Sequence, residues 1–171
     1  MRSTFRKKRR VLPILAIATV ATTVPGVSAA ADNSPLSPYL LRTFAGKCLD
    51  VRGSSTANGA LIIQFHCTGG LNQRFGFTRY PDDTYSFVTA DAHKCLDVAG
   101  SSTADGAPII QYTCTAQPNQ RFLRVPPSSR KFEIRTLAGK CLDVRGSSTA
   151  DSAQIIQFRC TGEPNQQFEV G

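Results

Sequence analysis

The sequence predicts an all-β fold built from three pseudo-symmetric repeats of about 46 residues, each with four short strands. The motif Cys-Leu-Asp-Val recurs at Cys48, Cys95 and Cys141, at offsets of 47 and 46 residues. Residues 42–75 match residues 135–168 at 26 of 34 aligned positions, which chance does not produce. Apolar residues come in short runs without a clear helical period. Three repeats favour a small closed barrel with pseudo-threefold symmetry, since β-propellers usually need about four to eight blades.

The strands of the first repeat are predicted at residues 41–44, 48–51, 61–65 and 74–78. These runs are apolar or rich in strand-forming residues, and Gly, Ser, Asn or Asp separates them. The repeats span about 38–84, 85–130 and 131–171. Four short strands cannot bury a face alone, so the three units must close around a shared core.

The N-terminal segment is predicted to be an export signal. Six basic residues precede an apolar run over 11–24 and the small residues of Val27-Ser28-Ala29, a pattern typical of a cleaved leader. We expect a signal peptide over 1–29, with Ala31 as an alternative cleavage point, a linker over 30–37 and one domain over 38–171. A membrane anchor needs roughly 18 or more apolar residues. The run is shorter, so the mature protein is expected to be secreted, extracellular and free of the membrane.

The net charge of +8 comes mostly from this leader. Without its six basic residues the chain has 14 Lys and Arg against 12 Asp and Glu, a balance of +2. A body so close to neutral gives no electrostatic reason to expect a nucleic-acid partner.

The six cysteines are predicted to form three disulfides inside their repeats. Each Cys-Leu-Asp-Val cysteine is followed 19 positions later by a second cysteine, which favours the pairs Cys48–Cys67, Cys95–Cys114 and Cys141–Cys160. An exported chain meets the oxidising compartment that such bonds require. Each bond would close a loop of about 20 residues and contribute about 3 kcal/mol on the chain-entropy model. No metal is expected, because no CxxC or His-bracketed spacing occurs.

The repeated pattern CLD, IIQF, C and NQxF resembles the ricin B-type lectins, or family 13 carbohydrate-binding modules. The resemblance covers 38–171 and implies a β-trefoil in a secreted, single-domain protein of bacterial type. Members of this family occur as sugar-binding appendages of secreted glycosidases and toxins, and as free-standing lectins. The closing Gln-x-Trp of the family ends here in Phe75, Phe122 and Phe168, which keep an aromatic plug for the core.

An aspartate and an aromatic residue are expected to meet in each repeat. Strand alternation places Asp50 on the side of Cys48 and Phe65 on the side of Cys67, so the disulfide would bring carboxylate and ring together. A carboxylate accepts strong hydrogen bonds from two neighbouring sugar hydroxyls. An aromatic ring covers the apolar face of a pyranose.

The resemblance implies four sugar-binding residues in each repeat. These are Asp50, Phe65, Asn72 and Gln73, then Asp97, Tyr112, Asn119 and Gln120, and finally Asp143, Phe158, Asn165 and Gln166. The aspartate is expected to face solvent, the Asn to contact a hydroxyl and the Gln to hold the aspartate. Alternatively, the aspartate caps a turn, the ring fills a minor core and the amides make loop hydrogen bonds. Against that alternative, an aspartate is a poor strand former, yet it recurs three times.

The predicted function is a secreted lectin with up to three weak sites that act by avidity on polysaccharide or glycan. We expect a monomer without a cofactor. An enzyme is not expected, because a glycosidase needs two carboxylates about 5 to 9.5 Å apart, whereas the three aspartates are separated by the symmetry. His66 and His93 occupy non-equivalent positions. The alternative is a trefoil that binds a protein, such as a hydrolase inhibitor, through the non-repeated segments 81–83 or 126–131.

Overall fold

The computed structural model describes residues 38–126 and 130–171, and in them the chain forms twelve strands and six short 3-10 helices. The first repeat holds β1 (Tyr39–Thr43), β2 (Cys48–Val51), β3 (Ile62–Phe65) and β4 (Arg74–Arg79). The second holds β5 (Tyr85–Thr89), β6 (Cys95–Val98), β7 (Ile109–Tyr112) and β8 (Phe122–Val125). The third holds β9 (Lys131–Thr136), β10 (Lys140–Val144), β11 (Ile155–Arg159) and β12 (Phe168–Val170). The predicted pattern of four strands per repeat is confirmed, while the predicted leader and linker lie outside the described residues.

Six strands close a barrel. The first and fourth strands of each repeat pair in the cyclic order β1, β4, β5, β8, β9, β12 and back to β1, and every pair is antiparallel. The closing pair joins the two ends of the domain, with Leu41 opposite Val170. Closure leaves no free edge among these strands, which an open sheet of the same size would expose.

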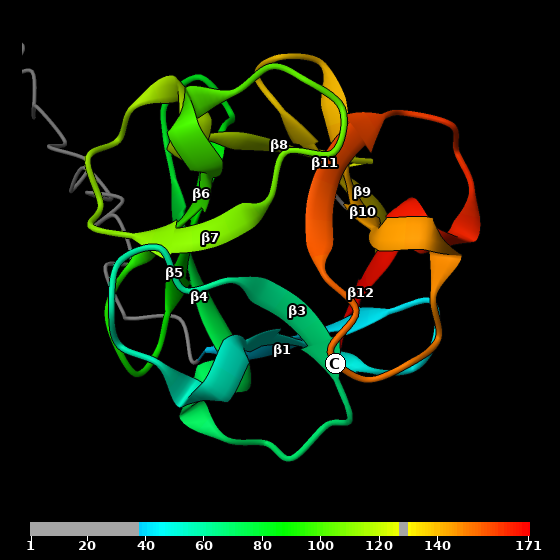
Figure 1. The fold of residues 1–171 in the computed structure, drawn as a ribbon. Helices are drawn as coiled ribbons and strands as arrows, with labels where there is room; N and C mark the ends of the chain where they lie inside the picture. Colours follow the sequence, from blue (N-terminus) through cyan, green and yellow to red (C-terminus); the bar gives the residue numbers. More distant parts are fainter. Residues whose placement is uncertain (1–37, 127–129) are drawn as a thin grey trace, which may run out of the picture. The chain divides into compact units, whose positions relative to one another are not determined.

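The second and third strands of each repeat form a hairpin: β2 with β3, β6 with β7, and β10 with β11. Figure 1 shows the three repeats arranged around a common axis, with β3, β7 and β11 near its centre. Single bridges link the hairpins to one another there: Leu61 with Ile110, Ile63 with Gln154, and Pro108 with Ile156. The repeats therefore contact each other at the hairpins as well as in the barrel.

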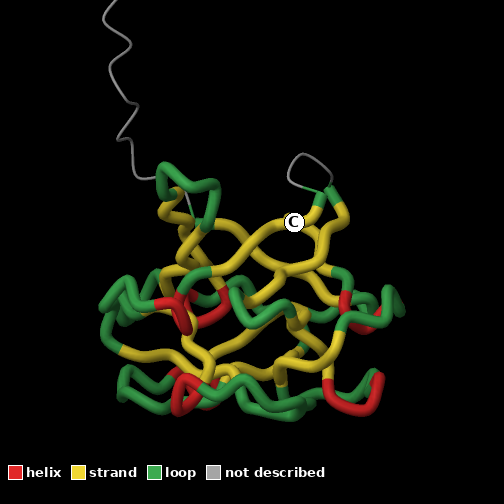
Figure 2. The backbone as a smooth tube through the Cα atoms, turned by 90° about the horizontal axis from the view of Figure 1, so that it is seen from above, coloured by secondary structure: helices red, strands yellow, loops and turns green. Residues whose placement is uncertain are grey.

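Among residues 38–126 and 130–171, helical content is confined to turns of three residues. One turn follows the second strand of each repeat (η1 Arg52–Ser54, η3 Ala99–Ser101, η5 Arg145–Ser147), and one precedes the last strand (η2 Leu71–Gln73, η4 Pro118–Gln120, η6 Pro164–Gln166). In Figure 2 these turns lie in the lower half of the view. Gly53 in η1 has φ +65°, a conformation that glycine adopts without strain and that redirects the chain after β2. No helix in the described part is long and apolar enough to cross a membrane.

The core collects equivalent residues from all three repeats. Phe75, Phe122 and Phe168 are at most 1% exposed, which confirms the predicted aromatic plug. The hairpins add alternate apolar residues, and these are Leu49, Val51 and Ile62, then Leu96, Val98 and Ile109, and then Leu142, Val144 and Ile155. Because strand side chains alternate, the same hairpin strands turn their cysteine and aspartate away from this core.

Candidate functional site

The three aspartates lie one residue before the end of their hairpin strands and are buried. Asp50, Asp97 and Asp143 are 4%, 5% and 5% exposed. The expectation that they face solvent is therefore wrong. They are covered because the turn before the last strand of each repeat lays an Asn and a Gln over the carboxylate.

In every repeat the Asn and Gln donate to the same carboxylate oxygen. In the first, Asn72 Nδ2 lies 2.9 Å and Gln73 Nε2 lies 2.8 Å from Asp50 Oδ2. The distances to Asp97 Oδ2 are both 2.8 Å, and those to Asp143 Oδ2 are both 2.9 Å. We call this Asp–Asn–Gln group the carboxylate network of its repeat.

The Gln of each network is locked by backbone on both ends of its amide. Gln73 Nε2 also donates to His66 O at 2.9 Å, and Gln73 Oε1 accepts from Thr68 N at 2.8 Å. Gln120 and Gln166 make the same pair of contacts with the loops of their own repeats. All three are at most 1% exposed. The Gln therefore holds the aspartate and is closed to a ligand, in agreement with the role expected for it.

The second oxygen of each carboxylate remains available. Within the described residues, Oδ1 of Asp50, Asp97 and Asp143 accepts no hydrogen bond. Burial raises the pKa of all three carboxyl groups, and the hydrogen bonds from Gln and Asn offset part of that rise. An acceptor oxygen that is fixed in place and partly desolvated binds a hydroxyl donor strongly.

In two repeats the aspartate of the network lines a hollow. The first hollow, of about 360 Å³, is lined by Asp50, Phe65 and Asn72, with Arg52 at its rim. The third hollow, of about 470 Å³, is lined by the equivalent Asp143, Phe158, Asn165 and Arg145. Carboxylate and ring thus reach one cavity in the first and third repeats, as strand alternation predicted.

The second repeat is built differently around the same network. A hollow of about 370 Å³ beside its Asn119 is lined by Ser101 and by Leu137 of the third repeat, so it does not correspond in position to the first and third hollows. Tyr112 is 43% exposed and stands where the other repeats have a phenylalanine. At the position of Arg52 the second repeat has Ala99, so its rim carries no guanidinium.

Each hollow is completed by a neighbouring repeat, which the sequence analysis missed. Ser152 of the third repeat lines the first hollow, and Gly106 of the second lines the third. Gln64 fixes the first border, since its Nε2 donates to Ser148 O at 2.8 Å and to Ala150 O at 2.9 Å. Gln111 and Gln157 likewise each donate to two backbone carbonyls of the preceding repeat. The signal was the Gln that recurs in IIQF, IIQY and IIQF, a buried amide inside an apolar strand.

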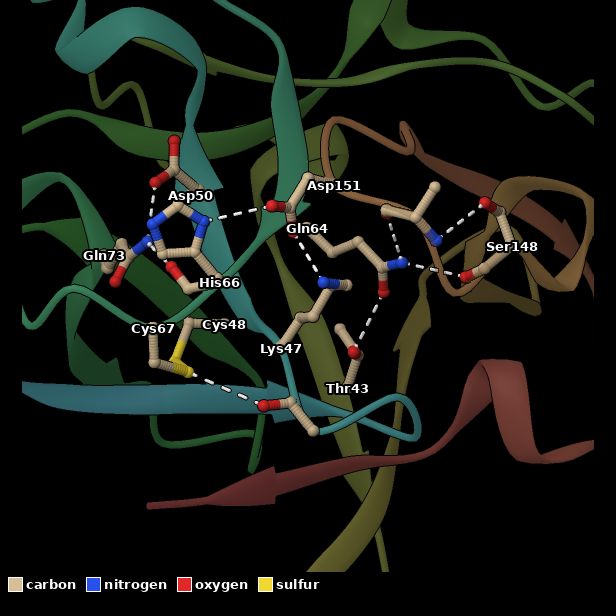
Figure 3. Close-up of polar contacts among 12 residues, drawn as sticks. Thr43, Lys47, Cys48, Asp50, Gln64, His66, Cys67, Gln73, Ser148 and Asp151 are labelled. Atoms are coloured by element: carbon tan, nitrogen blue, oxygen red, sulfur yellow. Dashed lines mark hydrogen bonds and ion pairs between the residues drawn. A yellow bond between two sulfur atoms is a disulfide. The ribbon is translucent and has the colours of Figure 1, made fainter.

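Charged groups add to the border of the first repeat. Asp151 of the third repeat contacts Lys47 Nζ at 2.6 Å and His66 Nδ1 at 3.0 Å. The imidazole of His66 also lies against Phe65, with ring centres 4.2 Å apart. Figure 3 shows His66 between the Asp50–Gln73 pair and Asp151. The hydrogen bonds from Lys47 and His66 lower the pKa of Asp151.

The three predicted disulfides are confirmed as Cys48–Cys67, Cys95–Cys114 and Cys141–Cys160. They join the strand that carries the aspartate to the chain just beyond the aromatic residue. Glu133 lies close to Cys141 and Cys160, which gives three groups that could ligate a metal. Both sulfurs are used in the disulfide, and Arg135 binds the Glu133 carboxylate at 2.7 Å, so this group offers no thiolate ligand.

Known structures with this architecture include lectins and carbohydrate-active proteins. The designed threefold-symmetric protein ThreeFoil is 37% identical, with a TM-score of 0.74 over 77% of this chain and 96% of that chain. An exo-β-1,3-galactanase from Clostridium thermocellum is 31% identical, with a TM-score of 0.75 over 79% of this chain and 30% of that chain. A ricin B-like lectin from Macrolepiota procera, solved with lactose, is 18% identical, with a TM-score of 0.66 over 77% of this chain and 92% of that chain, and shares the fold. A search of curated proteins finds no match.

The family model for the ricin-type beta-trefoil lectin domain matches residues 38–168. The match supports carbohydrate binding and indicates a non-catalytic fold. The three disulfides are consistent with an extracellular protein. This chain therefore belongs to the ricin-type beta-trefoil lectin family.

Proposed function

We propose that this chain is secreted after removal of its leader and acts as a monomeric lectin with up to three weak sugar sites. The observation that carries the proposal is the carboxylate network, which recurs in every repeat with one oxygen held by protein amides and the other left for a ligand. Two neighbouring sugar hydroxyls can donate to that oxygen, while Phe65, Tyr112 or Phe158 covers the apolar sugar face.

The expected affinity of one site follows from the small surface that a sugar would bury there. A shallow aromatic face and a few hydrogen bonds bury little surface, so a monosaccharide should bind one site with a Kd of roughly 0.1 to 10 mM, or about 3 to 5 kcal/mol. Three sites on one rigid body meet an immobilised polysaccharide at high effective concentration. Avidity gains of about 10² or more are then available.

A protein-binding role is less favoured by the non-repeated loop over 81–83. Asp82 is paired with Arg121, and Asp83 is paired with Arg79. Hydrogen bonds from Thr84 and Arg121 lower the pKa of Asp82. Each acid of this loop therefore already has an arginine partner within the chain, and both carboxylates lie at the surface.

The test compares retention on polysaccharide columns for the native protein, for variants that keep one aspartate, and for the triple variant Asp50→Asn, Asp97→Asn, Asp143→Asn. The native protein should be retained longest, the single-site variants should elute early, and the triple variant should elute with the void marker. A single-site variant that elutes with the native protein would refute avidity. A triple variant that is retained like the native protein would refute the sites.

A further inference from the structure

The first hollow holds two opposite charges that do not touch each other. Asp50 and Arg52 both line it, yet no ion pair joins them in the part of the chain that the structure describes. Arg52 makes one long side-chain hydrogen bond, from Nη2 to Ser152 O at 3.4 Å. Most donor groups of Arg52 therefore have no partner in the described residues, and the same hollow is lined by Asp50, whose Oδ1 accepts no hydrogen bond there.

The third hollow has the same pair, Asp143 and Arg145, but a second carboxylate lines it as well. That carboxylate belongs to Glu163, at the position of Gly70 in the first repeat and Gln117 in the second. The lining of the third hollow is therefore net negative when its acids are ionised, whereas the lining of the first is balanced. In the second repeat, Ala99 replaces the arginine altogether.

Two further ionisable groups act on Asp50 without lining the first hollow. Asp91 raises the pKa of Asp50 and His66 lowers it, both less than burial does. His66 is turned toward Asp151 of the third repeat. The guanidinium of Arg52 is thus the positive group that a ligand in the first hollow meets.

We propose that the first hollow selects sugars that carry a carboxylate, such as a hexuronate unit, with Arg52 as the residue that determines this specificity. The ligand carboxylate pairs with the guanidinium fork, and its ring hydroxyls donate to Asp50 Oδ1. A hexuronate places these groups on different ring carbons, so one sugar can satisfy both walls of the hollow. The third and second repeats lack the preference, because Glu163 offsets Arg145 in one and no arginine exists in the other. This inference rests on the proposed function, since it concerns the same site.

Nuclear magnetic resonance titration of ¹⁵N-labelled protein reads each repeat separately, through the amides of Thr68, Thr115 and Thr161 that bind the network glutamines. The probes are galacturonate against galactose and glucuronate against glucose, with sodium acetate as a control for charge alone. In at least one pair, the amide of Thr68 should report an acid that binds about three to ten times more tightly than its neutral partner. Added salt should reduce this preference, because the guanidinium is exposed.

Two variants use residues that the chain already carries at equivalent positions. Arg52→Ala, which copies the second repeat, should abolish the acid preference at the first hollow, so that an acid and its neutral partner bind there with equal affinity. Glu163→Gln, also found in the second repeat, should create an acid preference at the third hollow. The second variant tests the idea independently, even where the first perturbs the local fold.

Equal binding of acidic and neutral sugars at the first hollow would overturn the inference and leave the proposed function standing. The same holds if acetate shifts the Thr68 amide as strongly as the sugar acids do, or if Arg52→Ala keeps the preference. No response from any repeat to any of the four sugars would overturn both.

Discussion

The first and second repeats have the same carboxylate network but differ at two positions beside it. The hydrogen bonds to Asp50 and Asp97 agree within 0.1 Å, from 2.8 to 2.9 Å. The rim of the first carries Arg52 and a half-buried Phe65, whereas the second has Ala99 and an exposed Tyr112. The network thus behaves as part of the fold, and its constancy says little about selectivity. Under the proposal above, selectivity is set by these two positions.

The border with the preceding repeat also differs, because it is charged at the first repeat and neutral at the second. Asp151 binds Lys47 and His66 at the first repeat. At the second, Asn58 occupies the equivalent position and bonds with Thr113 through neutral groups, at 3.0 and 3.1 Å. The border therefore requires a polar contact at this place, while a charge is optional.

The largest expected effect concerns what the repeats share. The double variant Cys95→Ser, Cys114→Ser should lose roughly 3 kcal/mol of unfolding free energy, because it frees a loop in the unfolded chain. The matched variant Cys48→Ser, Cys67→Ser should lose the same amount, since both loops have a sequence separation of 19. Urea unfolding measures both. A difference of more than about 1 kcal/mol between the two losses would show that the disulfides do not stabilise the two repeats equally.

The next effect separates binding from stability. Asp97→Asn keeps an oxygen for Asn119 and Gln120 but turns an amide toward the ligand, so sugar binding at the second site should weaken by about 1.5 to 3 kcal/mol. The free energy of unfolding at pH 7 should not fall, because burial disfavours the ionised form of Asp97. Calorimetry and urea unfolding test the two parts. Asp50→Asn should behave alike, and a fall in stability in either variant would contradict the account of the network.

The pH dependence follows from the raised pKa of the same groups. Each network carboxyl takes up a proton at a higher pH than an ordinary aspartate, so sugar binding should be lost earlier on acidification than an exposed aspartate would predict. Folding stability should respond in the opposite sense. Ionisation of these groups opposes folding above their folded pKa, and the penalty is relieved as the pH falls toward the unfolded value. Affinity of the native protein measured against pH tests this, and affinity that holds down to the range in which an ordinary aspartate takes up its proton would contradict the raised pKa.

The smallest expected effect comes from exchanging the charged border of the first repeat and the neutral border of the second. Asn58→Asp gives the second repeat the acid found at Asp105 and Asp151, facing Lys94 at the position of Lys47. The melting temperature should rise by about 1 to 2 °C at low salt, and the gain should vanish at high salt because exposed ion pairs are screened. Asp151→Asn is the reverse exchange at the first repeat. An increase that persists in high salt would show that the contact is not an ion pair.

The sequence was sufficient for the features that depend on repetition. Equal spacing predicted the pairing of Cys48 with Cys67, and the family resemblance at the recurrent Phe75 predicted the core plug. The burial of Asp50 escaped prediction because its cover, Asn72 and Gln73, folds over it from a turn more than 20 residues away. Gln64 escaped for a related reason. A lone amide in an apolar strand does not reveal that its acceptors belong to another repeat, since only closure of the ring brings them near.

The three repeats form a closed ring, so none of them is structurally the first. The first and third hollows are each bordered by the preceding repeat, and the series of borders runs through the junction of β1 with β12, where Gly171 N donates to Leu40 O at 2.9 Å. The N-terminal site is consequently completed only once the third repeat has been made, since its wall at Ser152 belongs to that repeat. The same closure means that the repeats can be joined in a different order along the chain. A chain joined between residues 171 and 38 and reopened between two repeats would keep the same contacts between neighbouring repeats. The site geometry therefore depends on the closed arrangement of the repeats and not on their order along the chain.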